Sequence, residues 1–419
     1  MSKPTLAVIG AGVSGVVAAY YLQDQYDVTL LEKEKRIGGH THTVEIASGP
    51  DQGLKIDTGF IVCNRHNYPH FFQFLSNLGV STQASDMSFS FYDEKRDFCW
   101  GSDFPTGVFA RFSHWFCRDY YGLLWEMARF NRLAVRFYHR KDVDLNLTIE
   151  EWLNQHGFSD AFSSGYVVPM GAAVWSCSQQ ELMKFPALAF FRFWYNHGLL
   201  KMFRRPEWRT VAGGSNSYLD VFETKFSGKI EVGVNISGIQ SNEKGVKVRF
   251  KGQPERFFDR VVVSTHADTA LSLLSEPTAD QGRLLGAWRY SNNEVFLHMD
   301  DRVMPPLKSL WCSWNYVQPD YPDLDDPLMV TYYMNRLQRL QTEQSYFVTL
   351  NPVCSIPSEK VVRKLNYTHP IFDRVSLATQ SELPRLNHHH SILFCGSYFG
   401  YGFHEDAVLS AKNLVDMLT

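Results

Sequence analysis

Near its N-terminus the chain reads Val8-Ile9-Gly10-Ala11-Gly12-Val13-Ser14-Gly15, and this stretch decides the fold. The apolar residues before Gly10 are typical of a buried parallel strand, and a helix is expected over 13–23. Gly10 permits a tight turn between the two, while Gly12 lets a pyrophosphate approach the backbone. Gly15 lets the helix pack closely on the strand, so that its free N–H groups point at the phosphates. The stretch therefore predicts a dinucleotide-binding turn.

A second strand and an acidic residue follow at the spacing that this motif requires. Residues 28–31 form another apolar run, and Glu32 stands at its end. A carboxylate there accepts hydrogen bonds from a ribose 2′-OH and repels a 2′-phosphate. A glycine-rich turn with a solvated Glu32 is the alternative. This alternative is the weaker interpretation, because the strand, the helix and the acidic residue all occur at the spacing of the dinucleotide-binding motif.

The next residues carry a resemblance to a known family. The stretch Glu32-Lys33-Glu34-Lys35-Arg36-Ile37-Gly38-Gly39-His40 resembles a signature of the flavin amine oxidase superfamily, which includes phytoene desaturases and protoporphyrinogen oxidases. That signature is Glu, three residues, Arg, one residue, Gly-Gly, and then Arg or His. In the superfamily the Arg and the paired Gly lie beside the pyrophosphate and isoalloxazine of FAD. Residues 392–398 and 400–407 are similar to the superfamily's final strand and to the helix start beside the flavin.

This resemblance implies FAD as the cofactor and a set of residues that contact it. The expected cofactor-binding residues are Gly10, Gly12, Ser14, Gly15, Glu32, Lys33, Arg36, Gly38, Gly39, His40, Gly396, Ser397, Gly402 and Phe403.

Four shorter strings resemble one branch of the superfamily. They are residues 38–43, 297–300, 313–316 and 401–406. They are similar to bacterial FAD/NAD-binding proteins that are often encoded beside cyclopropane-fatty-acid synthase-like methyltransferases. The resemblance implies redox chemistry on fatty acyl chains of phospholipids, such as desaturation or reduction near a methyl or methylene branch. It also makes a lipid methyltransferase a candidate partner.

The positions of these motifs predict an α/β protein with two discontinuous domains. We expect a Rossmann-like FAD-binding domain over 1–85, 206–285 and 385–419, and a substrate domain over 86–205 and 286–384. Apolar β-rich runs at 328–334 and 347–350 predict an antiparallel sheet under the flavin, joined by helices. Alternation over 229–263, with turn signals at 242–245, predicts a small three-stranded insertion in the nucleotide domain.

Composition excludes several classes of protein. The 419 residues are 44% apolar and 20% charged, and the net charge of −3 gives no nucleic-acid signature. Seven cysteines without C-x-x-C spacing indicate reduced thiols, and neither a signal peptide nor a membrane-spanning run is recognisable. We expect a cytoplasmic protein whose membrane contact is at most peripheral, at the inner face. An aromatic content of 15% suits a bulky core and a pocket for a long apolar substrate equally well.

The most periodic stretch of the chain is residues 112–141. One helix face collects Phe116, Tyr120, Leu123, Met127, Phe130, Ala134 and Phe137, and the other side carries Arg129, Arg132, Arg136 and Arg140. Further cations follow at Lys201, Arg204, Arg205 and Arg209. The favoured interpretation is an apolar face on the core with solvated arginines. The alternative is a surface that docks on anionic lipid headgroups.

A flavin carries redox chemistry itself, so the protein needs only to orient the substrate and move protons. The sequence shows no Ser-His-Asp triad and no metal site, and His388-His389-His390 is better explained as a solvated or packed polar turn than as metal ligands. The catalytic candidates are His404, Tyr398 and His40, with His42 and Glu405 as further groups near the flavin.

His404 ranks first, because it follows a glycine turn beside the expected isoalloxazine; a hydrogen-bonded structural role is the alternative. Glu405 is also suited to cap the last helix. His298 and Asp300 end a strand and face either the flavin or polar partners.

One departure from the superfamily bears on the reaction. Amine oxidases of the superfamily usually carry a Lys just before an apolar strand, where it holds a water against flavin N5. Here residues 292–297 have Glu294 instead, which disfavours amine oxidation. The sequence contains no second glycine fingerprint for NAD(P). Three hypotheses remain: an FAD-dependent oxidoreductase on an apolar lipid-linked substrate, an amine or amino-acid oxidase, and a non-catalytic flavoprotein partner of a lipid methyltransferase.

Overall fold

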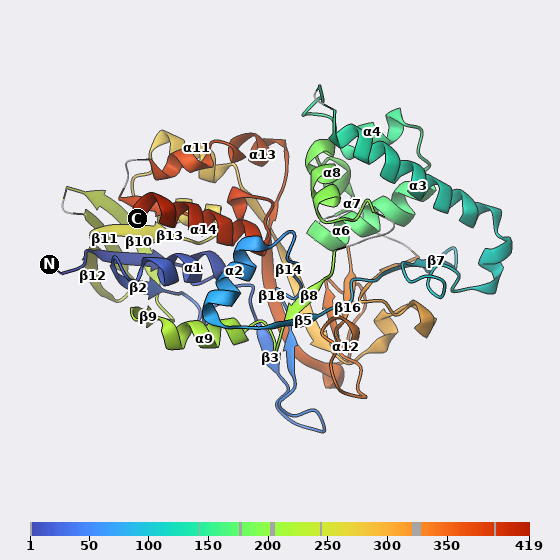
Figure 1. Ribbon diagram of the computed structural model, residues 1–419, viewed down its shortest axis with the longest axis horizontal. Helices are drawn as coiled ribbons and strands as arrows, with labels where there is room; N and C mark the ends of the chain where they lie inside the picture. Colours follow the sequence, from blue (N-terminus) through green and yellow to red (C-terminus); the bar gives the residue numbers. More distant parts are fainter. Residues whose placement is uncertain are drawn as a thin grey trace.

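The computed structural model describes residues 2–140, 142–175, 178–201, 206–243, 245–320, 328–388 and 391–419. Its elements form two lobes, with β14 (Arg289–His298) and β18 (Val361–Ile371) lying between them (Figure 1). The predicted residues Arg204, Arg205, His389 and His390 lie outside the described part of the chain.

The first lobe is built on a parallel sheet. Within the described residues its strand order is β19 (Ile392–Phe394), β13 (Arg260–Val263), β1 (Thr5–Ile9), β2 (Asp27–Leu31) and β9 (Lys229–Glu231). Strand β1 alternates: Leu6 and Val8 pack on one face of the sheet, and Ala7 and Ile9 on the other. Both faces are therefore covered, as expected of an apolar parallel strand. The predicted α/β class is confirmed.

Helices cover this sheet. Helix α1 (Val13–Leu22) leaves β1 at the glycine turn and packs beside α14 (His404–Leu418), at the chain's C-terminal end (Figure 1). Further elements of this lobe are α2 (Pro69–Leu78), α9 (Ser217–Lys225), α10 (Ala267–Leu273), α11 (Ala279–Gly286) and α13 (Arg374–Gln380). Short paired strands are β3 (Thr43–Glu45) with β4 (Lys55–Asp57), and β5 (Thr82–Ala84) with β8 (Arg209–Val211).

The predicted insertion at 229–263 is smaller than expected. Strands β10 (Ile236–Asn242), β11 (Gly245–Phe250) and β12 (Gln253–Phe258) form the antiparallel meander. Its flanks, β9 and β13, instead pair with the parallel sheet. Buried Val261 and Val262 explain the difference, because a continuous apolar run suits a strand covered on both faces.

The second sheet is mainly antiparallel. Where the chain is described, its order is β18, β14, β17 (Phe347–Leu350), β16 (Val330–Tyr333), β15 (Trp314–Gln318), β6 (Phe89–Asp93) and β7 (Phe98–Gly101). Strands β6 and β15 run parallel. The apolar runs predicted to form this sheet supply β16 and β17. All seven strands fall inside the segments assigned to the substrate domain, whereas the domain boundaries themselves stay a prediction.

A group of helices completes the second lobe. They are α3 (Arg118–Tyr138), α4 (Ile149–Gln155), α5 (Asp160–Phe162), α6 (Val168–Trp175), α7 (Gln179–Met183) and α8 (Ala187–Asn196). Helix α6 contacts β15, while α3 and α4 pack against α8, and α12 (Met334–Leu337) contacts the central strands β16 and β17. No helix in the described ranges is both long and apolar enough to cross a bilayer.

Helix α3 differs from its prediction at one end. Its buried face carries Tyr120, Leu123, Phe130, Ala134 and Phe137 as expected. The helix begins only at Arg118, because residues 112–116 form a short 3₁₀ turn, and Phe116 is 77% exposed rather than packed. Of the predicted arginines, Arg132, Arg136 and Arg140 are exposed, whereas Arg129 lies over the ring of Phe158.

Candidate active site

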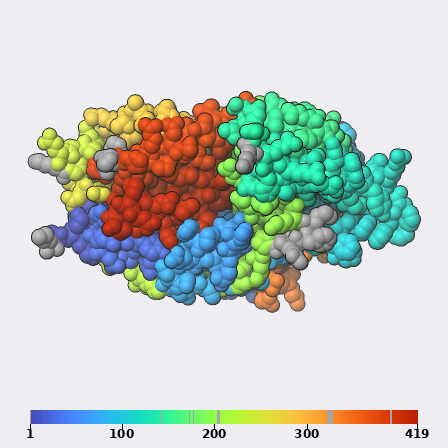
Figure 2. All heavy atoms as spheres, turned by 45° about the horizontal axis from the view of Figure 1, so that its top comes forward, coloured from blue at the N-terminus to red at the C-terminus, as the bar shows by residue number. Residues whose placement is uncertain are grey.

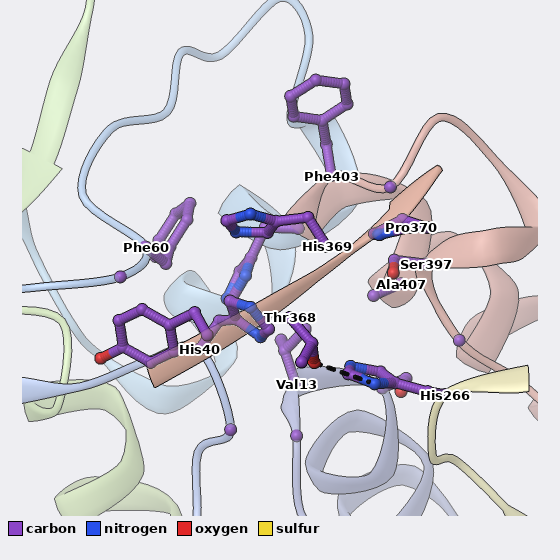
Figure 3. Close-up of a pocket in the computed structure, with 18 of the residues that line it drawn as sticks. Val13, His40, Phe60, His266, Thr368, His369, Pro370, Ser397, Phe403 and Ala407 are labelled. Atoms are coloured by element: carbon purple, nitrogen blue, oxygen red, sulfur yellow. Dashed lines mark hydrogen bonds between the residues drawn. The ribbon is translucent and has the colours of Figure 1, made fainter. Parts of the chain in front are cut away.

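A cavity of about 1060 Å³ lies where the two sheets meet (Figure 3). Its polar end is formed by the carboxyl ends of β1, β2 and β13, and by the start of α14. Ligands bind at this edge in open parallel sheets. The other end reaches between the second sheet and helices α6 and α8.

The glycines of the first turn shape the polar end. Gly10 has φ +97°, and an added Cβ would lie 2.9 Å from the Ser264 carbonyl oxygen. A Cβ on Gly15 would collide with the Gly10 carbonyl, so Gly15 serves helix packing and does not line the cavity. Gly12 is different: a Cβ there meets nothing within 4 Å. The space beside Gly12 belongs to the cavity, as a bound pyrophosphate requires.

Glu32 is fixed at the end of β2. Its carboxylate oxygens accept hydrogen bonds from the Ala11 N–H at 2.7 Å and the Glu34 N–H at 2.8 Å. Each oxygen keeps a lone pair for a further donor, and the residue lines the cavity. The carboxylate is thus oriented in advance for ribose hydroxyls.

Arg36 braces the second glycine loop. Its guanidinium donates to the carbonyls of Thr41 at 3.0 Å and Gly39 at 2.7 Å. Arg36 itself does not line the cavity, unlike Lys33, Gly38, Gly39 and His40. Its position differs from the expected contact with the cofactor: the side chain holds the loop that forms the wall.

The C-terminal segment forms the opposite wall. Gly396, Ser397, Gly402 and Phe403 line the cavity beside Ser14 of α1. Tyr398 is buried and lines it as well, and its hydroxyl has no hydrogen-bond partner among the described residues. Burial raises the pKa of Tyr398 well above its usual range, so the phenol stays neutral.

Glu405 does not cap α14 as the sequence suggested. Its oxygens accept from the N–H groups of His70 and Phe71, each at 2.9 Å, and so cap α2. Asp406 accepts from the Phe403 N–H and caps α14 instead. Burial raises the pKa of Glu405 to about 7. Glu405 therefore joins the start of α14 to α2 and does not line the cavity.

His404 lines the cavity in a constrained position. Its ring stacks on Phe60 with centroids 3.7 Å apart, and its Nε2 lies 3.1 Å from the Tyr218 hydroxyl. Burial lowers the pKa of His404 to about 3, so the imidazole is neutral near pH 7. One ring nitrogen is therefore already committed to a protein partner.

Three further imidazoles lie together around β18 (Figure 3). The His40 ring is 5.3 Å from that of His369 and 6.2 Å from that of His266. His369 Nδ1 is 3.0 Å from the Asn293 amide nitrogen, and His266 Nδ1 is 3.2 Å from the Thr368 hydroxyl.

His40 is the exception within this cluster. Its Nε2 is buried and has no partner among the described residues. Burial lowers the pKa of His40 well below its usual value, and the neighbouring imidazoles lower this pKa further. Burial is also the main cause that lowers the pKa of His369 to about 4, with His266 adding to the effect. The cluster therefore consists of neutral imidazoles beside the cavity, and the buried Nε2 of His40 is left without a hydrogen-bond partner among the described residues.

The far end of the cavity is an apolar chamber. It is lined by Ile61, Val62, Tyr68, Met87, Phe89, Met170, Ala173, Val174, Phe193, Leu199, Trp208, Trp314, Tyr332 and Leu350. Among the described residues that line the whole cavity, the carboxylates are Glu32 and Glu34, both beside β2, and the lysines are Lys33 and Lys251. The chamber thus offers a ligand hydrophobic contacts and no carboxylate.

Other predicted residues lie outside the cavity. His298 Nε2 is 2.7 Å from the Thr349 hydroxyl, and Asp300 pairs with Arg302 and Lys360, so both are satisfied structural groups. His42 bonds the Tyr367 hydroxyl. Glu294 pairs with Lys364 on the exposed side of β14. The neighbouring residue, Asn293, faces the histidine cluster and contacts His369.

Sequence reasoning missed the β18 residues and His266. Tyr367, Thr368, His369 and Pro370 all line the cavity, and they belong to no recognised motif. The one signal in the sequence is the polar run 366–369 inside an otherwise ordinary strand, which is a weak one.

The comparisons agree with this geometry. The family model for flavin-containing amine oxidoreductases matches residues 13–417. The chain belongs to this family. It is an FAD-dependent oxidoreductase, and its α/β fold with a Rossmann-like FAD-binding domain is that of the family.

Solved structures of this flavin oxidoreductase fold align over nearly the whole chain. A CLA-producing fatty acid isomerase from P. acnes has 16% identity and a TM-score of 0.69, covering 99% of this chain and 98% of its own. Cyclohexylamine oxidase from Brevibacterium oxydans has 14% identity and a TM-score of 0.68, covering 99% of both chains. A putrescine oxidase bound to putrescine has 13% identity, 99% coverage of both chains and a TM-score of 0.67. At these identities the likeness shows the fold alone. No curated protein sequence matches significantly.

The residues present fit FAD. The open space beside Gly12, the fixed carboxylate of Glu32 and the loop braced by Arg36 form a cradle for the adenosine diphosphate part. When bound, FAD supplies hydride or electron transfer at its isoalloxazine.

Removing the Glu32 carboxylate should weaken FAD binding. We expect Glu32→Ala to lose roughly 1–3 kcal/mol of binding free energy, because ribose hydroxyls and two backbone N–H groups lose their acceptor. Glu32→Gln, which keeps one acceptor oxygen, should lose less. Titration of the apoprotein with FAD, followed by flavin fluorescence, measures both. Glu45→Ala, at an exposed residue of β3, is the matched control. Equal FAD affinity in Glu32→Ala and wild type would contradict the role of Glu32.

Proposed function

We propose that this flavin oxidoreductase changes the redox state of a phospholipid-linked fatty acyl chain. The apolar chamber carries the proposal. An acyl chain gains free energy by burying its methylene groups there. A protonated amine would enter as an unpaired charge, since the described lining residues at that end include no carboxylate.

Two similarities support this substrate class. The fatty acid isomerase from P. acnes has the same fold, so the fold accommodates an enzyme of fatty acids. The short strings at residues 38–43 and 401–406 resemble proteins encoded beside lipid methyltransferases. A branched chain made by such a methyltransferase is the substrate that we favour.

The chain's own residues would orient the substrate and move one proton. The chamber would hold the acyl chain away from water, and Gly39 and Phe403, which both line the cavity, would help to hold the flavin. Desaturation removes two hydrogens from adjacent carbons, one as a hydride and one as a proton. We assign the proton to His40 Nε2, because among the imidazole nitrogens of the described residues that line the cavity it is the one that is buried without a hydrogen-bond partner. Reduction would run the same transfer in reverse.

The flavin spectrum reports which substrate class reacts. Under anaerobic conditions we expect a phospholipid with methyl-branched, unsaturated acyl chains to reduce the oxidised enzyme or to reoxidise the reduced enzyme. We expect putrescine and cyclohexylamine to do neither. Stopped-flow absorbance of the flavin measures this. Reduction by the amines, with no response to the lipid in either redox state, would contradict the proposal.

Filling the chamber provides a second check. Ala173 is 4% exposed on α6 and lines the chamber, so Ala173→Trp should block the acyl chain without touching the nucleotide cradle. We expect the lipid response to be lost at unchanged flavin content. A lipid response as fast as that of wild type would place the substrate elsewhere.

A further inference from the structure

Exposed aromatic side chains gather in one segment. Phe104 and Phe112 are each 80% exposed, Phe116 is 77% exposed and Trp125 is 63% exposed, and Trp115 and Tyr121 are exposed beside them. Large apolar side chains exposed this closely together mark a binding surface. The segment stands out at the end of the molecule away from the parallel sheet (Figures 1 and 2).

Helix α3 extends this surface with cations. Arg118, Tyr121, Trp125, Arg132 and Arg136 recur every three, four or seven residues. At about 100° per residue they fall within an arc of about 60°, on the side opposite the buried face. The outer face of α3 therefore carries both aromatic rings and guanidinium groups. We call this face, together with Phe104, Phe112, Trp115 and Phe116, the docking face.

The cations of the docking face are free to meet an external anion. In the part of the chain that the structure describes, no acidic side chain forms an ion pair with Arg118, Arg132 or Arg136. All three are exposed. Neighbouring acids are the exposed Asp119 and the half-buried Glu126, and Glu126 accepts hydrogen bonds from Ser159. Arg209, at the start of β8, is not one of these free cations, because it forms an ion pair with Glu207.

We propose that the docking face binds the surface of an anionic phospholipid bilayer. Aromatic rings settle at the headgroup level, and arginines bind headgroup phosphates bidentately. A protein partner would be expected to cover such rings with a complementary groove. A lipid surface needs only projecting rings and unpaired cations, which is what the docking face presents.

The docking face shares a lobe with the apolar chamber. Phe130, on the buried side of α3, packs against Phe191 and Trp194 of α8, with ring centroids 5.6 and 5.7 Å apart. Phe193 of the same helix lines the chamber. Binding would thus bring the chamber's helical wall to the lipid surface. The inference does not depend on the proposed substrate.

Vesicle binding tests the inference without using turnover. Purified holoenzyme should co-sediment with vesicles of phosphatidylcholine and phosphatidylglycerol, less with phosphatidylcholine alone, and less at high salt. Brominated lipids should quench fluorescence from Trp115 and Trp125. Arg132→Glu/Arg136→Glu should weaken binding about 30-fold or more, and Phe112→Ser/Phe116→Ser at least about tenfold.

Matched controls change an exposed aromatic residue and two exposed cations elsewhere. Phe257→Ser removes an exposed aromatic ring from β12, and Lys229→Glu/Arg339→Glu reverses two exposed charges. Both should bind vesicles as wild type does, and all variants should keep their flavin. Absence of wild-type binding to anionic vesicles, or equal losses in docking-face and control variants, would overturn the inference. So would a lipid-free dimer, seen by ultracentrifugation, that only the docking-face variants dissociate, because it would assign the face to a second copy of the chain.

Discussion

Gly12→Asp is expected to give a folded protein that holds no FAD. Gly12 has φ −67° and ψ 176°, which any residue adopts, and a Cβ there meets nothing within 4 Å. The fold therefore tolerates the new side chain. The carboxylate would, however, project into the space for the pyrophosphate and repel it. Flavin absorbance per protein should fall to the background level.

The control for this variant is Gly282→Asp. Gly282 also leaves open space for a Cβ, but it lies on α11, away from the cavity lining. It should keep its flavin. Circular dichroism of Gly12→Asp should match that of the wild-type apoprotein. Stoichiometric FAD in the Gly12→Asp protein would overturn the assignment of the nucleotide site.

His40→Ala is expected to keep FAD and to slow turnover by about 10²–10⁴-fold, the usual contribution of a general acid or base. The cause is loss of the buried Nε2 that has no protein partner among the described residues. Added imidazole should partly restore turnover, because it returns a proton acceptor to the vacated space. A merely structural role would not give this rescue.

His404→Ala is the comparison for His40. His404 Nε2 is engaged by Tyr218, so this variant should lose its stacking on Phe60 and slow turnover less. Both variants are assayed by stopped-flow flavin absorbance with the branched phospholipid. Wild-type turnover in His40→Ala, or a larger loss in His404→Ala, would move the proton-transfer role to His404.

The nucleotide cradle could be predicted because its determinants are local. Gly10, Gly12 and Gly15 each act on backbone within a few residues, and Glu32 follows one strand later. The start of α14, near the C-terminal end, is likewise determined by residues that are close together in the sequence. Short-range sequence patterns are therefore sufficient to predict most of the polar wall.

The rest of the site depends on pairing between distant strands. His369 faces the cavity because β18 pairs with β14, with Ser291 opposite His369, and no local pattern specifies that register. Glu405 caps α2 because two helices remote in sequence meet there. Periodicity misplaced Phe116, since the helical repeat extends in sequence beyond the point where the core ends.

The central claim concerns the acyl chains of phospholipids. Mass spectrometry of acyl chains compares cells that express wild type with cells that express Gly12→Asp, with a lipid methyltransferase present in both. We predict a mass shift of two hydrogens on branched chains that appears only with wild type, and its sign gives the direction of the reaction. Identical acyl profiles, with both proteins expressed and wild type carrying FAD, would contradict lipid redox chemistry.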